Sequence, residues 1–125
     1  MGVMLSASYN RIVHPDVTPE FNAASKFDPL YGFRDGREEK VMIATQEEMD
    51  SLKMPMKYRD YCAHKYIEFQ RCRKANFPWV AACEHEKHEY HDCEYAEYID
   101  RMKDYERERR LMERAKRIAK KAEAA

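Results

Sequence analysis

The residues with the most evident chemistry are the four cysteines, which are regularly spaced. Nine residues separate Cys62 from Cys72, and nine separate Cys83 from Cys93. Ten positions along an α-helix span about 15 Å, whereas a disulfide requires Cα atoms within about 7 Å. Two cysteines on the same helix therefore cannot bond each other, so the disulfides must join two helices.

A short turn between the two cysteine pairs makes the predicted helices antiparallel neighbours. Cys72 then faces Cys83 near the turn, and Cys62 faces Cys93 one step further away. Pairing Cys62 with Cys83 and Cys72 with Cys93 would need parallel helices, which such a turn cannot connect. We therefore predict disulfides Cys62–Cys93 and Cys72–Cys83. By loop entropy the outer one stabilises the fold by about 3–4 kcal/mol and the nested one by less.

Other reactive arrangements are less consistent with the spacing. Zinc sites favour cysteines about two to four residues apart, and dithiol oxidoreductases use closely spaced pairs. His85, His88 and His91 recur every third residue but rotate around the helix among charged residues, which favours a solvated or partner-facing surface. We predict no catalytic residue, no metal, no cofactor and no small-molecule substrate.

The elements that position the cysteines are predicted to be helices throughout. After Pro78 the chain contains neither Gly nor Pro, which favours uninterrupted helix. Asn76 suits a left-handed helix C-cap, and Pro78 suits the first turn of the next helix. Phe69 and Tyr90 each lie three residues before a cysteine and should pack between the disulfides. The fold class is all-α: a disulfide-bridged antiparallel helical hairpin with an irregular N-terminal arm and a long C-terminal helical extension.

Four segments follow along the chain. Residues 1–40 form an extended arm, whose aromatic residues suggest that it lies on a partner or, alternatively, folds back on its own domain. Residues 41–57 are a helical lead-in, in which Thr45 and Glu48 have the form of a capping box. Residues 58–97 form the hairpin. Residues 98–125 are a charged helical extension, and its apolar stripe is too thin for self-burial, so it should dock on other subunits through Tyr98, Met102, Tyr105 and Met112.

Composition excludes several classes of function. The 23 basic and 23 acidic residues balance, which argues against a nucleic-acid binder. No apolar run approaches the roughly 18 residues of a membrane span. The N-terminus resembles neither a secretory signal nor a mitochondrial presequence.

Two C-x9-C units across a short turn resemble the twin C-x9-C family, also called coiled-coil–helix–coiled-coil–helix (CHCH) proteins. Four stretches, "YGF" at 31–33, "REEKVMIATQ" at 37–46, "RDYCAH" at 59–64 and "YERERRL" at 105–111, are similar to accessory subunits of the beta subcomplex of mitochondrial NADH:ubiquinone oxidoreductase, or complex I. The resemblance implies a non-catalytic subunit on the intermembrane-space side of the inner membrane. Its partners would be other membrane-arm subunits of complex I, which it would help to assemble and stabilise.

The resemblance also implies two events in biogenesis. An oxidoreductase import receptor of the intermembrane space would recognise aromatic residues beside a docking cysteine, as Phe69 and Tyr90 are. Gly2 begins a myristoylation motif, "MGVMLS", with Ser6 in the required place, and the resembled subunit is myristoylated there. A myristoyl chain would reach inner-membrane lipid, although one chain alone binds only marginally.

Two alternative functions remain within the same structural family. A membrane-tethered cristae-organising scaffold also pairs an "MG" start with a twin-cysteine domain, but its hairpin tends to end the chain. Here some thirty residues follow Cys93. A copper chaperone would need adjacent cysteines beyond the structural four.

Overall fold

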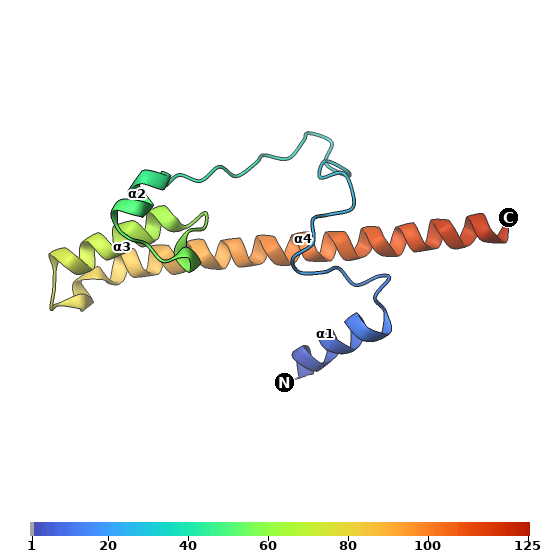
Figure 1. Cartoon of the computed structure of the whole chain (residues 1–125), viewed down its shortest axis with the longest axis horizontal. Coiled ribbons are helices and arrows are strands. Elements are labelled where there is room, and N and C mark those ends of the chain that lie inside the picture. The colour runs from blue at the N-terminus through green and yellow to red at the C-terminus, as the bar shows by residue number, and fades with distance from the viewer. Residues whose placement is uncertain (1) are drawn as a thin grey trace. The chain divides into compact units, whose positions relative to one another are not determined.

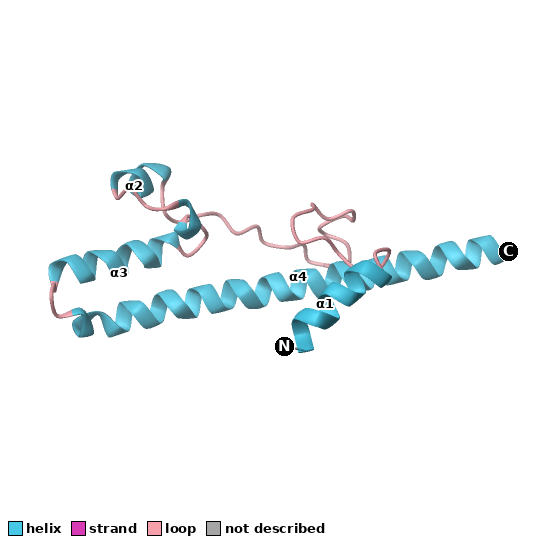
Figure 2. Cartoon of the chain, turned by 60° about the horizontal axis from the view of Figure 1, so that its bottom comes forward, coloured by secondary structure: helices cyan, strands magenta, loops and turns pink. Residues whose placement is uncertain are grey.

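The computed structural model describes residues 2–125, with side chains from Leu5 onward. Its regular elements within this range are all helical: α1 (Gly2–Val13), α2 (Gln46–Ser51), the 3-10 turn η1 (Met56–Tyr58), α3 (Ala63–Ala75), the 3-10 turn η2 (Val80–Cys83) and α4 (Glu84–Ala124). Figures 1 and 2 show α3 running back alongside the first part of α4 after a tight turn. The predicted all-α class with a disulfide-bridged hairpin and a long C-terminal helix is confirmed.

The chain divides into two compact units. One comprises Glu38–Asp100 and contains α2, α3 and the first part of α4, while the other comprises residues up to Arg37 together with Arg101–Ala125. In the Glu38–Asp100 unit, a small core of five buried residues forms where the chain leading into the hairpin meets α3. These residues are Ala44, Met49, Met54, Ala63 and Ile67, with Tyr58 and Tyr66 packed against them.

The predicted helical lead-in over 41–57 is much shorter than expected. Only α2 is α-helical there, and it begins after Thr45, whose hydroxyl accepts from the Glu48 amide while the Glu48 side chain accepts from the Thr45 amide. This is the predicted capping box, located at the start of the helix. The helix ends soon afterwards because Lys53 adopts a positive φ of 48° and Pro55 follows.

The turn of the hairpin also differs in detail from the prediction. Asn76 ends α3 with a φ of −105°, so its backbone is not left-handed. Its side-chain amide instead donates to the Cys72 carbonyl at 3.0 Å. The Phe77–Pro78 peptide bond is cis, and regular structure resumes only at Val80, so Pro78 lies in the turn rather than in the next helix.

The expectation of an irregular arm over residues 1–40 is wrong for the first part of this segment, which lies in the unit formed by residues up to Arg37 and Arg101–Ala125. Gly2–Val13 forms α1 because Leu5, Tyr9 and Ile12 recur with helical period, and Pro15 then disfavours helix in the preceding residue. Residues 14–37 are irregular and contact the chain's own α4, as the folding-back alternative proposed. Within this segment Gly32 has a φ of 88°, which glycine adopts without steric penalty.

Candidate functional site

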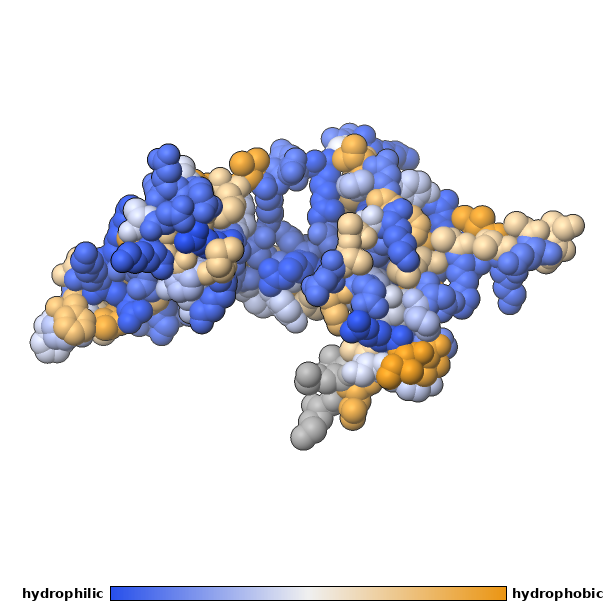
Figure 3. Space-filling model, viewed as in Figure 1, coloured by the Kyte–Doolittle hydropathy of each residue, from blue (hydrophilic) through white to orange (hydrophobic). Residues whose placement is uncertain are grey.

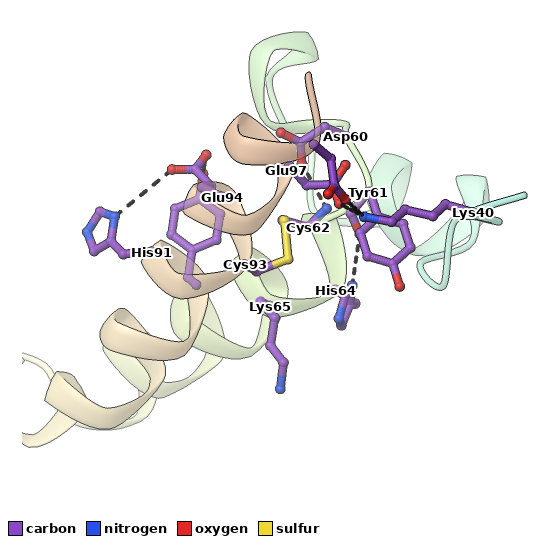
Figure 4. The surroundings of a disulfide bond; sticks show 12 residues. Lys40, Asp60, Tyr61, Cys62, His64, Lys65, His91, Cys93, Glu94 and Glu97 are labelled. Atoms are coloured by element: carbon purple, nitrogen blue, oxygen red, sulfur yellow. Dashed lines mark hydrogen bonds and ion pairs between the residues drawn. A yellow bond between two sulfur atoms is a disulfide. The ribbon is translucent and has the colours of Figure 1, made fainter. Parts of the chain in front are cut away.

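Two disulfides form the covalent framework of the hairpin. Cys62 bonds Cys93 with a Cα–Cα distance of 5.9 Å, and Cys72 bonds Cys83 at 5.8 Å. This is the pairing that the spacing predicted. Two of the four cysteines lie outside the α-helices themselves: Cys62 is the N-cap residue that precedes α3, and Cys83 is the last residue of the η2 turn. Figure 4 shows the outer disulfide lying between Tyr61 and His64 on one side and Glu94 on the other. Cys62 and Cys83 are fully buried.

Tyrosines fill the space between the two helices. Tyr58 stacks on Tyr66 with ring centroids 4.3 Å apart, and Tyr66 meets Tyr90 edge to face at 5.5 Å. The Tyr90 hydroxyl donates to Glu94. Burial, followed by that bond, raises the pKa of Tyr90 well above its usual value, so the hydroxyl stays protonated. The arrangement is a structural core.

The two aromatic residues that precede cysteines occupy different environments. Tyr90 is buried at 5% exposure, whereas Phe69 is half-buried and lies under the guanidinium of Arg73, 5.6 Å from the ring centroid. Only Tyr90 has ring contacts with the tyrosines of the hairpin.

Ion pairs add a second set of links within this unit. Lys65 on α3 reaches Glu89 on α4 at 2.9 Å and its own-helix neighbour Glu68 at 3.3 Å. The hydrogen bond to Glu89 is the largest cause of the raised pKa of Lys65. Lys40 binds Glu97 and, at 2.6 Å, Asp100. Figure 4 shows its chain passing beside Tyr61, with 5.1 Å between the ammonium and the ring centroid.

The histidines of α4 point to solvent. The side chains of His85, His88 and His91 are 80%, 67% and 57% exposed, and each meets a glutamate of its own helix. Among residues 2–125 the potential metal ligands that lie within 4.8 Å of one another are Cys72, Cys83 and Glu86. Because both of these sulfurs belong to a disulfide, they are not available as thiolate ligands.

The apolar stripe predicted to dock on other subunits is only partly free. Tyr98 and Met102 are 52% and 51% exposed. Tyr105 and Met112 are half-buried. Phe21 stacks on Tyr105 at 6.3 Å, so the chain itself covers part of this stripe.

A network that the sequence reasoning missed holds segment 14–37 against α4. Arg107 donates to the carbonyls of Asp28 and Tyr31 at 3.1 and 2.7 Å and lies over the ring of Phe33. Further links join Ser25 to Glu108, Arg37 to Asp104, Arg114 to Tyr31, and Lys116 to Asp16. The available signal was the combination of aromatic residues in 21–33 with the arginine-rich stretch after Tyr105.

Exposed hydrophobic residues are concentrated in two parts of the surface. Figure 3 shows a largely hydrophilic surface on which hydrophobic residues gather at α1 and at the turn of the hairpin. Within the described residues no helix combines the length and apolarity that crossing a membrane requires.

Comparisons with known proteins agree on one family. The family model of the NADH-ubiquinone oxidoreductase B18 subunit (NDUFB7) matches residues 43–105, which include α2, α3 and the first half of α4. The chain is 43% identical over 117 residues to NADH dehydrogenase (ubiquinone) 1 beta subcomplex subunit 7 of Bos taurus, covering 94% of this chain and 83% of that protein. The chain is 42% identical to the subunit of the same name in Mus musculus, and the match covers 97% of this chain and 86% of that protein. It is 41% identical to the subunit of the same name in Caenorhabditis elegans, and the match covers 94% of this chain and 96% of that protein.

Proposed function

Because this chain belongs to the family of the NADH-ubiquinone oxidoreductase B18 subunit, we propose that it is a non-catalytic accessory subunit of mitochondrial complex I. The observation that carries this proposal is similarity over nearly the whole chain rather than over the hairpin alone. The hairpin is a structural part: its cysteines are all engaged in disulfides and its tyrosines form the core. Its role is to brace neighbouring subunits during assembly and afterwards.

The proposed location is the intermembrane-space side of the inner membrane, with peripheral attachment. Two disulfides in a small domain require an oxidising compartment. In the reduced, unfolded chain, Phe69 and Tyr90 would both be accessible to an oxidoreductase import receptor. Tyr90 becomes buried when the hairpin closes, so recognition would precede folding and folding would end it.

Docking on other membrane-arm subunits would use the exposed part of the α4 stripe. Tyr98 and Met102 are the half of this stripe that remains open, and we assign them the main docking contact. Tyr105 and Met112 contribute less directly, because both are already half-buried within the chain.

A myristoyl chain on Gly2 would extend an apolar surface that α1 already presents. Leu5, Tyr9 and Ile12 recur along α1 and are 72%, 60% and 79% exposed. One acyl chain gives marginal, reversible membrane binding, so the helix and the lipid would act together. Intact-mass measurement on the mature protein tests this directly: a retained Met1, or a free or acetylated Gly2, contradicts it.

The proposed function is tested by native electrophoresis of mitochondria that carry a tagged copy of this chain. We expect the tag to migrate with complex I, and Tyr98→Glu combined with Met102→Glu to release it. Ala96→Glu is the matched control, because Ala96 is exposed on the same helix and lies about 160° around it from Tyr98. Migration with a cristae-organising assembly instead would favour the alternative scaffold function and refute the assignment to complex I.

A further inference from the structure

The turn of the hairpin carries the most exposed aromatic residues of the described chain. We call Asn76–Val80 the tip. Phe77 is 80% exposed, Trp79 78% and Val80 43%. Neither aromatic ring of the tip has a ring or cation contact among the residues that the structure describes, whereas Phe69 on α3 lies under Arg73. Nothing in the hairpin therefore accounts for large apolar side chains at these positions.

The backbone of the tip is held firmly although its side chains project. The disulfide Cys72–Cys83 closes the loop at its base. The Trp79 amide donates to the Asn76 carbonyl at 2.7 Å, and the Ala82 amide donates to the Trp79 carbonyl at 3.2 Å. Side chains presented from a constrained loop lose little conformational entropy on binding. The tip is thus preorganised to insert a small apolar wedge into a partner.

The charge around the tip indicates what the partner is. On the α3 side of the tip the sequence holds three cations, Arg71, Arg73 and Lys74, while the acids at this end of the hairpin, Glu84 and Glu86, follow only after Cys83. Glu84 meets His88 of its own helix at 3.1 Å. Arg71 and Lys74 form no ion pair with the residues that the structure describes. An anionic surface with an apolar layer just beneath it would satisfy both the cations and the rings.

We propose that the tip binds an anionic phospholipid bilayer, with Phe77 and Trp79 inserted at the level of the headgroups and Arg71, Arg73 and Lys74 facing the lipid phosphates. Tryptophan is enriched at membrane interfaces because its ring is apolar and its N–H remains hydrogen-bonded. This surface is separate from Gly2 and α1, and it needs no acyl chain. It also does not depend on assembly into complex I, so its failure would leave the proposed function intact.

Trp79 is the only tryptophan of the chain, so its fluorescence reports on the tip alone. The experiment mixes the oxidised full chain, produced without the acyl chain, with vesicles of phosphatidylcholine containing phosphatidylglycerol. We expect a blue shift of the Trp79 emission and quenching by lipids brominated at shallow acyl positions. Vesicles of pure phosphatidylcholine should give a much weaker shift, and soluble glycerophosphoglycerol none, which separates a bilayer from a free phosphate group.

Variants that keep the reporter then test each part of the surface. Phe77→Ala should lower the partition coefficient by about tenfold, because one large aromatic side chain no longer enters the interface. Lys74→Gln should lower it by about fivefold on anionic vesicles only. Tyr95→Ala and Lys103→Gln, which change exposed residues of α4, should leave it unaltered. Disulfide mapping of each variant verifies that the hairpin has formed.

Water-like emission of Trp79 in the presence of anionic vesicles would overturn the proposal. So would equal losses of binding in the control variants, because the attraction would then be general rather than located at the tip. If Phe77→Ala binds vesicles normally but no longer migrates with complex I, the tip contacts a protein groove instead, and the lipid assignment is wrong.

Discussion

The ring of Phe21 lies nearly parallel to the ring of Tyr105, with 18° between the planes and 6.3 Å between the centroids. Phe21 belongs to the irregular segment before the hairpin, and Tyr105 belongs to the long helix α4. This contact converts a residue that was expected to face another subunit into part of the chain's own packing. It also makes segment 14–37 dependent on the stability of the second half of α4.

Replacing Phe21 with Ala should loosen segment 14–37. An aromatic pair contributes about 0.5–1.5 kcal/mol beyond its buried area, so amide exchange of residues 21–37 should accelerate several-fold. Hydrogen-exchange mass spectrometry measures this locally. Amides of α3 should exchange as before, and Leu30→Ala, which removes an apolar side chain of the same segment but leaves the stacked pair of Phe21 and Tyr105 in place, is the matched control. Unchanged exchange in the Phe21 variant would show that the polar links hold the segment alone.

The two disulfides should differ in what they contribute. The outer pair joins residues 31 positions apart and the inner pair residues 11 apart. Loop entropy assigns them about 3.7 and about 2.8 kcal/mol when each acts alone. Cys62→Ser with Cys93→Ser should therefore lower the free energy of unfolding more than Cys72→Ser with Cys83→Ser, as measured by urea denaturation. Equal losses, or a larger loss for the inner pair, would contradict the entropic account.

Oxidation of the native protein can be examined without any variant. Non-reducing peptide mapping should recover Cys62 linked to Cys93 and Cys72 linked to Cys83. Recovery of free thiols, or of Cys62 linked to Cys72, would invalidate the hairpin geometry.

Thr45→Ala should weaken the short helix α2. It removes one of the two hydrogen bonds of the capping box, the one in which the Glu48 amide donates to the Thr45 hydroxyl at 3.2 Å. Loss of such a cap lowers the free energy of unfolding by about 1 kcal/mol. The core should be affected as well, because Met49 of α2 is one of its buried residues. Thr45→Ser keeps the acceptor and should retain most of the stability. Thermal unfolding of both variants makes the comparison.

Acid should loosen the last part of α4 through Glu106. Hydrogen bonds from Arg109, and then from Arg110, lower the pKa of Glu106 from 4.5 to about 2. The ion pairs therefore stabilise the folded state fully above pH 4.5, and this stabilisation is lost as the pH falls from 4.5 to about 2. An NMR titration of the Glu106 carboxyl carbon should show the lowered midpoint. Glu106→Gln should flatten the loss of helicity across that interval, and an unshifted midpoint would refute the pairing.

Much of the hairpin could be predicted because its constraints are local and covalent. A spacing of ten positions on each helix, a short turn and the length limit of a disulfide allow one pairing of Cys62, Cys72, Cys83 and Cys93. The core was harder to predict. Tyr90 was predicted to pack between the disulfides and is buried, but Met49, Met54 and Ile67 are buried because α2 and the loop after it fold over α3. No periodic pattern encodes such a contact.

The irregular segment shows a second limit of prediction. The aromatic residues of the arm, among them Phe21, Tyr31 and Phe33, indicated that residues 1–40 pack against another surface. The sequence pattern does not distinguish a partner protein from the chain's own domain as that surface. The choice depends on single long-range contacts such as Arg107 with the Asp28 and Tyr31 carbonyls. The α1 helix was missed for a different reason. The Pro and Asp residues that mark residues 1–40 as irregular all lie after Val13, and the helical spacing of Leu5, Tyr9 and Ile12 before them covers only about two turns.

The inner disulfide has a consequence for how the protein survives damage. Cys72 and Cys83 lie on either side of the tip, and Arg73 and Lys74, both exposed, are the kind of residues after which trypsin-like proteases cut. Hydrolysis at either position would leave two fragments that remain a single molecule until they are reduced. A nicked hairpin would thus keep α3 attached to α4, and the break would become visible only on a reducing gel.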